Sequence, residues 1–196
     1  MSEDIKPHMS DAKIQLLNDS ISRSKHYLEY GMGGSTILAS KQSLTSIVAI
    51  DSSEEWIGKV HSSIEKTVYA SNIYLLHADL GKTSDWGYPI DENKVKNWPQ
   101  YYASPWIKYR RLELSPDLIL IDGRFRTSCF LFSLLHSETE TRILWDDYLE
   151  RPEYHFVEKA LRPQGLIDDM AIFKVTEKID KQLVTFLLFE NLFNLD

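Results

Sequence analysis

The stretch Tyr27–Thr36, YLEYGMGGST, decides how the rest of the chain is interpreted. An apolar strand pattern ends at Gly31, and Gly33 and Gly34 follow where a helix can begin. Glycine allows a ligand to approach main-chain amides closely, and the N-terminus of a helix attracts negatively polarised groups. The stretch therefore predicts a ligand-binding loop between a strand and a helix.

A second signal lies at the end of the next strand. The run SIVAID ends in Asp51, twenty residues after Gly31, where a carboxylate can accept hydrogen bonds from both hydroxyls of a ribose. The glycine spacing departs from the dinucleotide pattern GxGxxG at Thr36, which favours an adenosine ligand without a pyrophosphate. The residues alone leave an alternative open, a plain glycine turn followed by a helix-capping aspartate.

Short apolar runs alternate with polar or helical stretches along most of the chain. This alternation is typical of an α/β fold with a parallel sheet. Strands are predicted at residues 27–30, 46–51, 72–79, 117–122 and 141–145. Several of these runs are continuously apolar, which indicates strands that are covered on both faces.

Three covering helices are predicted from apolar residues that recur every three or four positions behind a residue suited to a helix start. They follow Ser10 with Ile14, Leu17 and Ile21 inward, the capping pair Ser52 and Glu55 with Trp56, Val60 and Ile64 inward, and Pro152 with Tyr154, Val157 and Leu161 inward. Further on, residues 166–175 and 183–189 flank a charged turn at 177–181 that leaves no room for a helix. We predict a terminal antiparallel hairpin from this pattern.

Residues 81–111 break the alternation and hold three of the five tryptophans. We predict an aromatic-rich insertion, a lid or wall whose Trp and Tyr side chains pack a small separate core. No internal repeat or second linker is visible, so the expected organisation is one domain over residues 1–196, with a tail at residues 1–9.

Composition narrows the class of protein. A formal net charge of -7 argues against a broad nucleic-acid surface, because phosphate binding depends on clustered Lys and Arg. The single cysteine, Cys129, lies among apolar neighbours and is expected to be buried and inert. No apolar run approaches the ~20 residues of a membrane span, and the N-terminus lacks the order of a secretory signal. A cytoplasmic location is expected.

In order and spacing, YLEYGMGGST, VAID, LLHAD and DLILID resemble the class I S-adenosylmethionine-dependent methyltransferases, over about residues 25–160. The resemblance implies a three-layer Rossmann-like sandwich with a mostly parallel seven-stranded sheet and an antiparallel C-terminal strand. It implies that Glu29, Gly31 and Gly33 hold the methionine part of the cofactor, Asp51 the ribose and Asp79 the adenine. Ser35, Ser52, His77 and Asp122 complete the predicted cofactor-binding set.

Three carboxylates are candidate catalytic residues. Asp122 ends the fourth predicted strand, and Asp146 and Asp147 follow the fifth. If these strands are neighbours, the carboxylates gather beside the transferred methyl group, where one can accept a proton. They could also hold a divalent metal, since the cluster resembles that of the metal-dependent O-methyltransferases. Arg124 argues against the metal, because its guanidinium would repel a cation and could pair with one carboxylate.

Arg124 is also the candidate substrate anchor. Together with Arg126 and Arg151 near strand ends, and Lys108, Arg110 and Arg111 at the end of the insertion, it predicts a basic mouth and an anionic acceptor. The alternative is an ordinary solvated surface of scattered Arg and Lys.

The leading expectation is methyl transfer from S-adenosylmethionine to an oxygen or nitrogen of an unidentified small molecule or sugar. One alternative is a non-catalytic domain that binds S-adenosylmethionine or S-adenosylhomocysteine and serves a partner or regulator. Another is a nicotinamide-dependent oxidoreductase, which Thr36 disfavours. A small-molecule partner is expected, without nucleic acid or membrane, and a homodimer is left open.

Overall fold

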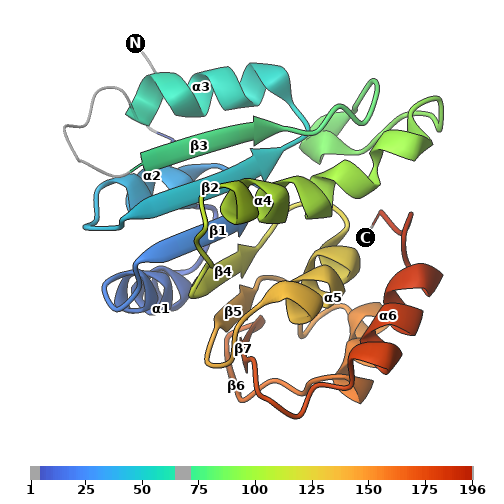
Figure 1. Ribbon diagram of the computed structural model, residues 1–196. Coiled ribbons are helices and arrows are strands. Elements are labelled where there is room, and N and C mark those ends of the chain that lie inside the picture. Colours follow the sequence, from blue (N-terminus) through green and yellow to red (C-terminus); the bar gives the residue numbers. More distant parts are fainter. Residues whose placement is uncertain (1–4, 65–71, 196) are drawn as a thin grey trace.

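Seven strands form one sheet in the order β3-β2-β1-β4-β5-β7-β6 in the computed structural model, which describes residues 5–64 and 72–195. Of the predicted tail, residues 1–4 lie outside the described part. The first five strands are β1 (His26–Tyr30), β2 (Ser46–Asp51), β3 (Asn72–His77), β4 (Leu118–Ile121) and β5 (Arg142–Trp145). They pair in parallel, so their carboxyl ends share one edge of the sheet (Figure 1). All five lie where the apolar runs predicted strands.

The C-terminal strands form a shorter hairpin than the sequence indicated. β6 (Gly165–Ile167) and β7 (Met170–Lys174) pair antiparallel, and β7 pairs antiparallel with β5. The predicted second arm, residues 183–189, is wrong, because these residues lie in helix α6 (Lys181–Glu190). The Asp180 carboxylate caps that helix by accepting from the main-chain amides of Gln182 and Leu183, at 3.0 and 3.1 Å. The antiparallel C-terminal strand is therefore β7.

Helices cover both faces of the sheet, which gives the predicted three-layer sandwich (Figure 1). On one face lie α1 (Asp11–Ile21), α2 (Gly34–Ser40) and α3 (Glu54–Ile64), whose apolar residues pack against Ile47 and Ala49 of β2. On the other face lie α4 (Pro99–Arg111), α5 (Arg126–His136) and α6, which pack against Val48 and Ile50. Alternate residues of one strand thus serve two separate layers.

The helix starts follow the predicted capping logic with one correction. Ser10 caps α1 by accepting from the Lys13 amide at 3.3 Å, as predicted. For α3 the predicted pair Ser52 and Glu55 is wrong, because Ser53 Oγ accepts from the Trp56 amide at 3.2 Å. The Ser52 hydroxyl is free to contact another segment, described below. Pro152 opens a 3-10 helix, η3 (Pro152–Lys159), that buries Tyr154 and Val157.

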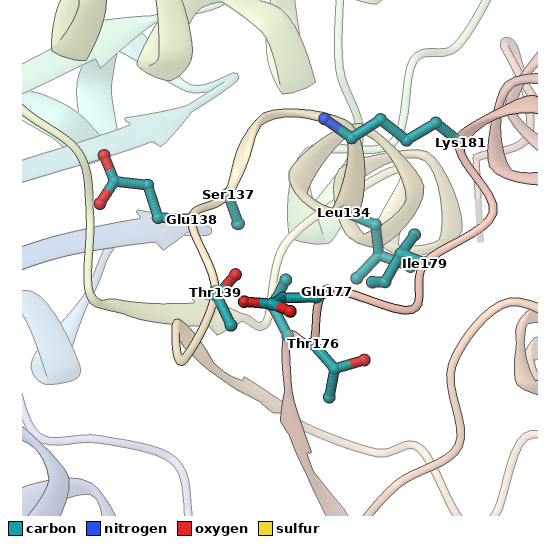
Figure 2. A pocket seen from close by; sticks show the side chains of 9 residues that line it. Leu134, Ser137, Glu138, Thr139, Thr176, Glu177, Ile179 and Lys181 are labelled. Atoms are coloured by element: carbon teal, nitrogen blue, oxygen red, sulfur yellow. The ribbon is translucent and has the colours of Figure 1, made fainter.

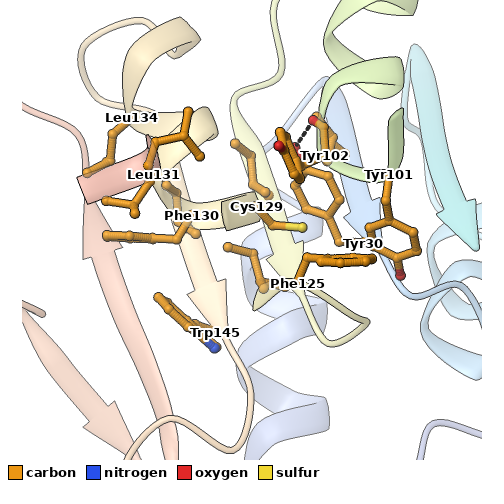
Figure 3. Close-up of a cluster of buried hydrophobic side chains, with 14 of the residues drawn as sticks. Tyr30, Tyr101, Tyr102, Phe125, Cys129, Phe130, Leu131, Leu134 and Trp145 are labelled. Carbon is orange, nitrogen blue, oxygen red and sulfur yellow. Dashed lines mark hydrogen bonds between the residues drawn. The ribbon is translucent and has the colours of Figure 1, made fainter. Parts of the chain in front are cut away.

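The aromatic-rich insertion contributes to the main core, not to a separate one. Buried side chains of α4 pack together with residues of β1, β4 and α5 (Figure 3). The Tyr30 hydroxyl donates to the Tyr102 carbonyl at 3.0 Å, and Trp106 Nε1 donates to the Tyr30 hydroxyl at 2.8 Å. Cys129 is fully buried in this cluster, as predicted. Most of the insertion's aromatic content therefore anchors α4 on the sheet.

The chain between β3 and α4 lies beyond the carboxyl ends of β2 and β3 (green in Figure 1). It turns back on itself at residues 83–89, where Thr83 and Pro89 form a β-bridge and the Ser84 amide donates to the Tyr88 carbonyl at 2.7 Å. Trp86 at the tip is 79% exposed. Among the described residues, no helix is long and apolar enough to cross a membrane.

Candidate cofactor and acceptor site

The loops that follow β1, β2, β4 and β5 meet at the shared edge of the sheet. In open α/β sheets, ligands bind in the crevice outside the carboxyl ends of the strands. Gly31 follows β1 with φ of +89°, a conformation that side-chain-bearing residues rarely adopt. A Cβ placed on Gly31 would lie 2.6 Å from Gly123 in the loop after β4. Two glycines thus let these two loops touch.

The rest of the glycine loop is more open. A Cβ on Gly33 would meet the Trp56 ring at 3.8 Å, an ordinary contact distance. Trp56 Nε1 donates to the Met32 carbonyl at 2.7 Å, which fixes the middle of the loop. Thr36 Oγ1 accepts from the Gly33 amide at 2.9 Å, so this side chain closes the turn into α2.

Glu29 lies beneath the loop. It is fully buried and accepts a hydrogen bond from the Ser35 hydroxyl. Burial raises its pKa to about 8, although the bond from Ser35 acts in the opposite direction. Both predicted cofactor residues therefore support the loop from inside, and a direct contact of either with a ligand stays a prediction.

The acid at the end of β2 lies in a sheltered position. Asp51 accepts from the Ser53 amide at 2.9 Å, and burial raises its pKa to about 6, against hydrogen bonds from the Ser53 and Ser52 amides and the charge of Arg124. The Ser52 hydroxyl donates to the Gly87 carbonyl at 3.3 Å, so the turn at residues 83–89 closes over this corner. His77 Nε2 lies 3.2 Å from the Ser52 carbonyl.

Asp79, the predicted adenine residue, forms contacts of its own. It pairs with Lys94 and accepts from the Gly81 amide at 3.2 Å. Lys94 lowers the pKa of this carboxyl. Asp79 side-chain exposure is 46%, so it lies at the outer rim of the site.

The three candidate catalytic carboxylates gather as predicted, because β4 and β5 are neighbours. A fourth acid, Asp169 in the β6–β7 turn, joins them from a part of the chain that the sequence did not single out. Asp146, Asp147 and Asp169 offer carboxylate oxygens within 4.8 Å of one another. This acid cluster, Asp122 with these three residues, lies beyond the ends of β4 and β5.

Basic side chains pair with the acid cluster. Lys13 Nζ lies 2.7 Å from Asp146 and also pairs with Asp169, and its side chain is 8% exposed. Arg126 bridges Asp122 at 3.2 Å and Asp147 at 3.1 Å. Arg151 adds a contact to Asp147 at 3.0 Å. With an ammonium between two of the acids, the cluster as arranged does not fit a divalent metal.

Burial and neighbouring charges shift the pKa values of several groups in this cluster. Burial raises the pKa of Asp122 to about 7, opposed by the Arg126 guanidinium and supported by the charges of Asp146 and Asp147. Burial also raises the pKa of Asp146, against its bond to Lys13. The pKa of Lys13 is raised, since its bonds to Asp146 and Asp169 outweigh burial, so this lysine stays charged. Asp122 is the acid of the cluster best suited to exchange a proton near neutral pH.

Arg124 does not pair with the carboxylates, contrary to the sequence-based expectation. That role belongs to Arg126, while the Arg124 guanidinium lies 4.0 Å from the centroid of the Tyr88 ring. The wider basic mouth is also wrong. Arg126 pairs with Asp122 and Asp147, and Arg151 pairs with Asp147. Helix α4 ends, with Lys108, Arg110 and Arg111, at the opposite edge of the sheet, before β4 begins.

A cavity of about 440 Å³ also lies at that opposite edge. Residues after α5, including Glu138 and Thr139, line it together with Glu177 and Lys181 before and within α6 (Figure 2). Because it lies away from the carboxyl ends of the parallel strands, it is separate from the site described above.

Comparisons with known proteins bear on the fold. No family model matches the sequence, and no curated protein matches it either. Among solved structures, a methyltransferase-like protein from Silicibacter pomeroyi matches with a TM-score of 0.86 at 26% identity, over 96% of this chain and 97% of that one. The fold is that of the class I S-adenosylmethionine-dependent methyltransferases.

Two further methyltransferase structures show the same fold at lower identity. The N-methyltransferase NodS from Bradyrhizobium japonicum, in complex with S-adenosylhomocysteine, matches with a TM-score of 0.55 at 14% identity, over 88% of this chain and 89% of that one. An O-methyltransferase from Bacillus cereus, also with S-adenosylhomocysteine, gives 0.50 at 15%, over 94% and 70%. The same fold therefore occurs in an N-methyltransferase and in an O-methyltransferase.

Sequence reasoning missed four residues of this site. Lys13 and Asp169 come from the N-terminal helix and the C-terminal hairpin, and nothing in their local pattern connects them with Asp146. Arg126 stood in the sequence only as part of a basic mouth. Tyr88 belongs to an insertion whose aromatic residues mostly enter the core. The four share no motif, so only the folded arrangement brings them to one site.

Proposed function

We propose that this protein transfers a methyl group from S-adenosylmethionine to an oxygen or nitrogen of a small-molecule or sugar acceptor. The observation that carries the proposal is the shared edge where the Gly31–Gly123 contact, the sheltered Asp51 and the acid cluster around Asp122 lie together. At this edge, glycines let a ligand come close to the main chain, one carboxylate can accept hydrogen bonds from ribose hydroxyls, and another can accept a proton.

In this proposal Gly31, Gly33 and Asp51 bind the cofactor, with Asp79 and His77 at the adenine end. Glu29, Ser35 and Ser52 support these positions. The bound cofactor supplies an electrophilic methyl group on a sulfonium. The acceptor attacks the methyl carbon, the carbon–sulfur bond breaks, and its electron pair stays on sulfur.

Asp122 accepts the proton that the acceptor releases. The charges of Asp146 and Asp147 influence the pKa of Asp122. Lys13 and Arg126 pair with the three acids and fix their positions. Proton transfer of this kind contributes about 10²–10⁴-fold to a rate, and orientation of the reactants contributes more. Since basic side chains already occupy the acid cluster, the proposed reaction uses no divalent metal.

One observation favours the non-catalytic alternative. Asp146 and Asp147 are both paired with basic side chains. The site therefore offers fewer unpaired acids for proton transfer than residues for binding the methyl donor. An S-adenosylmethionine-binding partner or regulator would need only the residues that bind the methyl donor. The nicotinamide alternative is weaker, because β7 runs antiparallel between β5 and β6, unlike the dinucleotide-binding strand order.

Calorimetric titration tests the proposal. The expected result is binding of S-adenosylmethionine and S-adenosylhomocysteine with Kd well below ~100 µM, and no binding of NADH. Asp51→Asn should weaken both adenosyl ligands about 10–100-fold, through loss of ~1–3 kcal/mol of hydrogen bonding. Asp91→Asn, at an exposed loop position, is the matched control.

The outcomes separate the candidates. Absence of binding to either adenosyl ligand contradicts both the enzyme and the binding-domain proposals. Tight binding without release of S-adenosylhomocysteine, across a panel of small acids, phenols and amines, favours the non-catalytic domain. NADH binding in place of the adenosyl ligands favours the oxidoreductase.

A further inference from the structure

Arg124 is a buried cation that forms no ion pair with the residues that the structure describes. Its side chain belongs to a residue that is 7% exposed, and its Nε and Nη1 atoms have no hydrogen-bond partner within residues 5–64 and 72–195. None of the ion pairs in this described part of the chain involves it. A buried charge is costly unless it is paired, so an unpaired guanidinium indicates that a partner comes from outside the protein.

The structure holds this arginine at two points. Its main-chain amide donates to the Tyr101 hydroxyl at 3.2 Å, and its guanidinium carbon lies 4.0 Å from the Tyr88 ring centroid. The aromatic ring stabilises the positive charge of the guanidinium. It does not supply an oxygen acceptor for the N–H groups of the guanidinium. The polar edge of the group is therefore left for a ligand.

Arg124 lies on the side of the site where Asp51 and the predicted cofactor-binding residues are. Gly87, next to Tyr88, accepts the hydrogen bond from Ser52, the neighbour of Asp51. The charge of Arg124 is also one of the influences that lower the pKa of Asp51 against burial. Arg126, two residues later, turns to the acid cluster instead. Two arginines separated by one residue thus serve two different parts of the site.

We infer that Arg124 is an anion-binding residue that receives a carboxylate or phosphate group of a ligand bound beside Asp51. Guanidinium groups recognise both anions through charge-assisted hydrogen bonds. The identity of the ligand rests on the proposed function. Under that proposal the anion comes either from the carboxylate of the adenosyl cofactor or from an acid group on the acceptor.

The first experiment compares S-adenosylhomocysteine with 5′-methylthioadenosine, which lacks the carboxylate. The variants are Arg124→Gln and Arg124→Lys, with Arg23→Gln as a control at an exposed position after α1. If the cofactor supplies the anion, Arg124→Gln weakens S-adenosylhomocysteine about 10–100-fold, the scale of one hydrogen bond to a charged group. It leaves 5′-methylthioadenosine within about twofold, and Arg124→Lys gives an intermediate loss.

The second experiment asks whether a separate anion is bound. Inorganic phosphate is added to the wild-type protein with and without 5′-methylthioadenosine, and the unfolding temperature is measured. A rise in the wild-type protein and in Arg23→Gln, but not in Arg124→Gln, supports binding of an acceptor anion. If Arg124→Gln matches Arg23→Gln in both experiments, the inference is wrong.

A stability measurement excludes a merely structural role. Removal of an unpaired buried charge should leave the unfolding temperature of the empty protein unchanged or higher. A lower temperature in both Arg124→Gln and Arg124→Lys than in Arg23→Gln would overturn the inference, because Arg124 would then stabilise the empty fold. If the wild-type protein binds neither adenosyl ligand, the proposed function fails while the phosphate comparison still decides the role of Arg124.

Discussion

Gly31 and Gly123 touch where the loops after β1 and β4 cross, and neither position has room for a side chain. A Cβ on Gly31 would lie 2.6 Å from the Cα and amide nitrogen of Gly123, and the φ of Gly31 is +89°. The contact joins the predicted cofactor loop to the loop that carries Asp122. The first glycine of the motif is therefore required by the fold before any ligand is considered.

Gly31→Ala is expected to destabilise the protein by roughly 2–4 kcal/mol, since it adds overpacking to a strained backbone. Thermal unfolding measures the loss. Gly58→Ala is the control, because that glycine lies inside α3 with nothing within 4 Å of an added Cβ, and it should gain up to about 1 kcal/mol. Equal stability of the Gly31 variant and the wild-type protein would contradict the close contact.

Gly33→Ala should separate ligand binding from folding. Its φ of 179° suits any residue, and an added Cβ meets the Trp56 ring at 3.8 Å. The unfolding temperature should therefore change little, while affinity for S-adenosylhomocysteine falls at least several-fold if the ligand approaches this part of the main chain. Unchanged affinity in calorimetry would place the ligand away from Gly33.

The sequence predicted the sheet well because burial on both faces leaves a clear mark. β2 begins and ends at the predicted residues, and the other four parallel strands differ only at their ends. The same reasoning failed at α6, where LVTFLLF is as apolar as a strand. Two of its apolar residues, Phe186 and Phe189, are exposed at 71% and 67%, so the helical period was hidden by apolar residues facing outward.

The candidate site was predictable only in part, for a different physical reason. Residues at strand ends follow from the fold, so the gathering of Asp122, Asp146 and Asp147 could be anticipated. Their partners could not, because Lys13 reaches the site from a helix before β1. Side-chain pairing across distant segments depends on packing, and a single sequence carries no record of it.

Lys13→Met should leave the carboxylates of Asp146 and Asp169 without their shared cation. We expect a loss of roughly 3 kcal/mol in stability, at the low end for a buried pair because Asp169 is 22% exposed. Mn²⁺ should recover part of this loss in the variant, since three carboxylates lie within 4.8 Å of one another.

The matched control for Lys13→Met is Lys59→Met, which removes an exposed pair with Glu55 and should change the stability little. In the wild-type protein, neither Mn²⁺ nor EDTA should change the unfolding temperature or the methyl-transfer rate. Loss of activity in EDTA that Mn²⁺ restores would contradict the assignment of Lys13 and Arg126 as the cations of the acid cluster.

The pH dependence of methyl transfer should report on Asp122. Its pKa is about 7, and only the ionised carboxylate accepts a proton, so kcat/KM should rise with pH below about 7 and level off above it. Asp146→Asn removes a charge that raises this pKa, so the midpoint should move to lower pH. A midpoint that stays in place in Asp146→Asn would exclude Asp122 as the titrating group.

Glu29 should make the wild-type protein less stable as the pH rises. The folded-state pKa of about 8 lies above the ordinary glutamate value of 4.5, so the native state binds more protons than the unfolded state between these values. Stability contributed by the protonated form is then lost at about 1.4 kcal/mol per pH unit, and disappears as the pH passes about 8.

Glu29→Gln keeps a neutral side chain at every pH. The unfolding temperature of the wild-type protein relative to this variant should therefore fall by several degrees from pH 6 to pH 9, at ~2–4 °C per kcal/mol. Glu55→Gln, at an exposed position whose pKa is lowered by Lys59, should show no such fall. A constant difference between the wild-type protein and Glu29→Gln would mean that Glu29 is already ionised in the folded state, and that its buried charge is stabilised by the glycine loop.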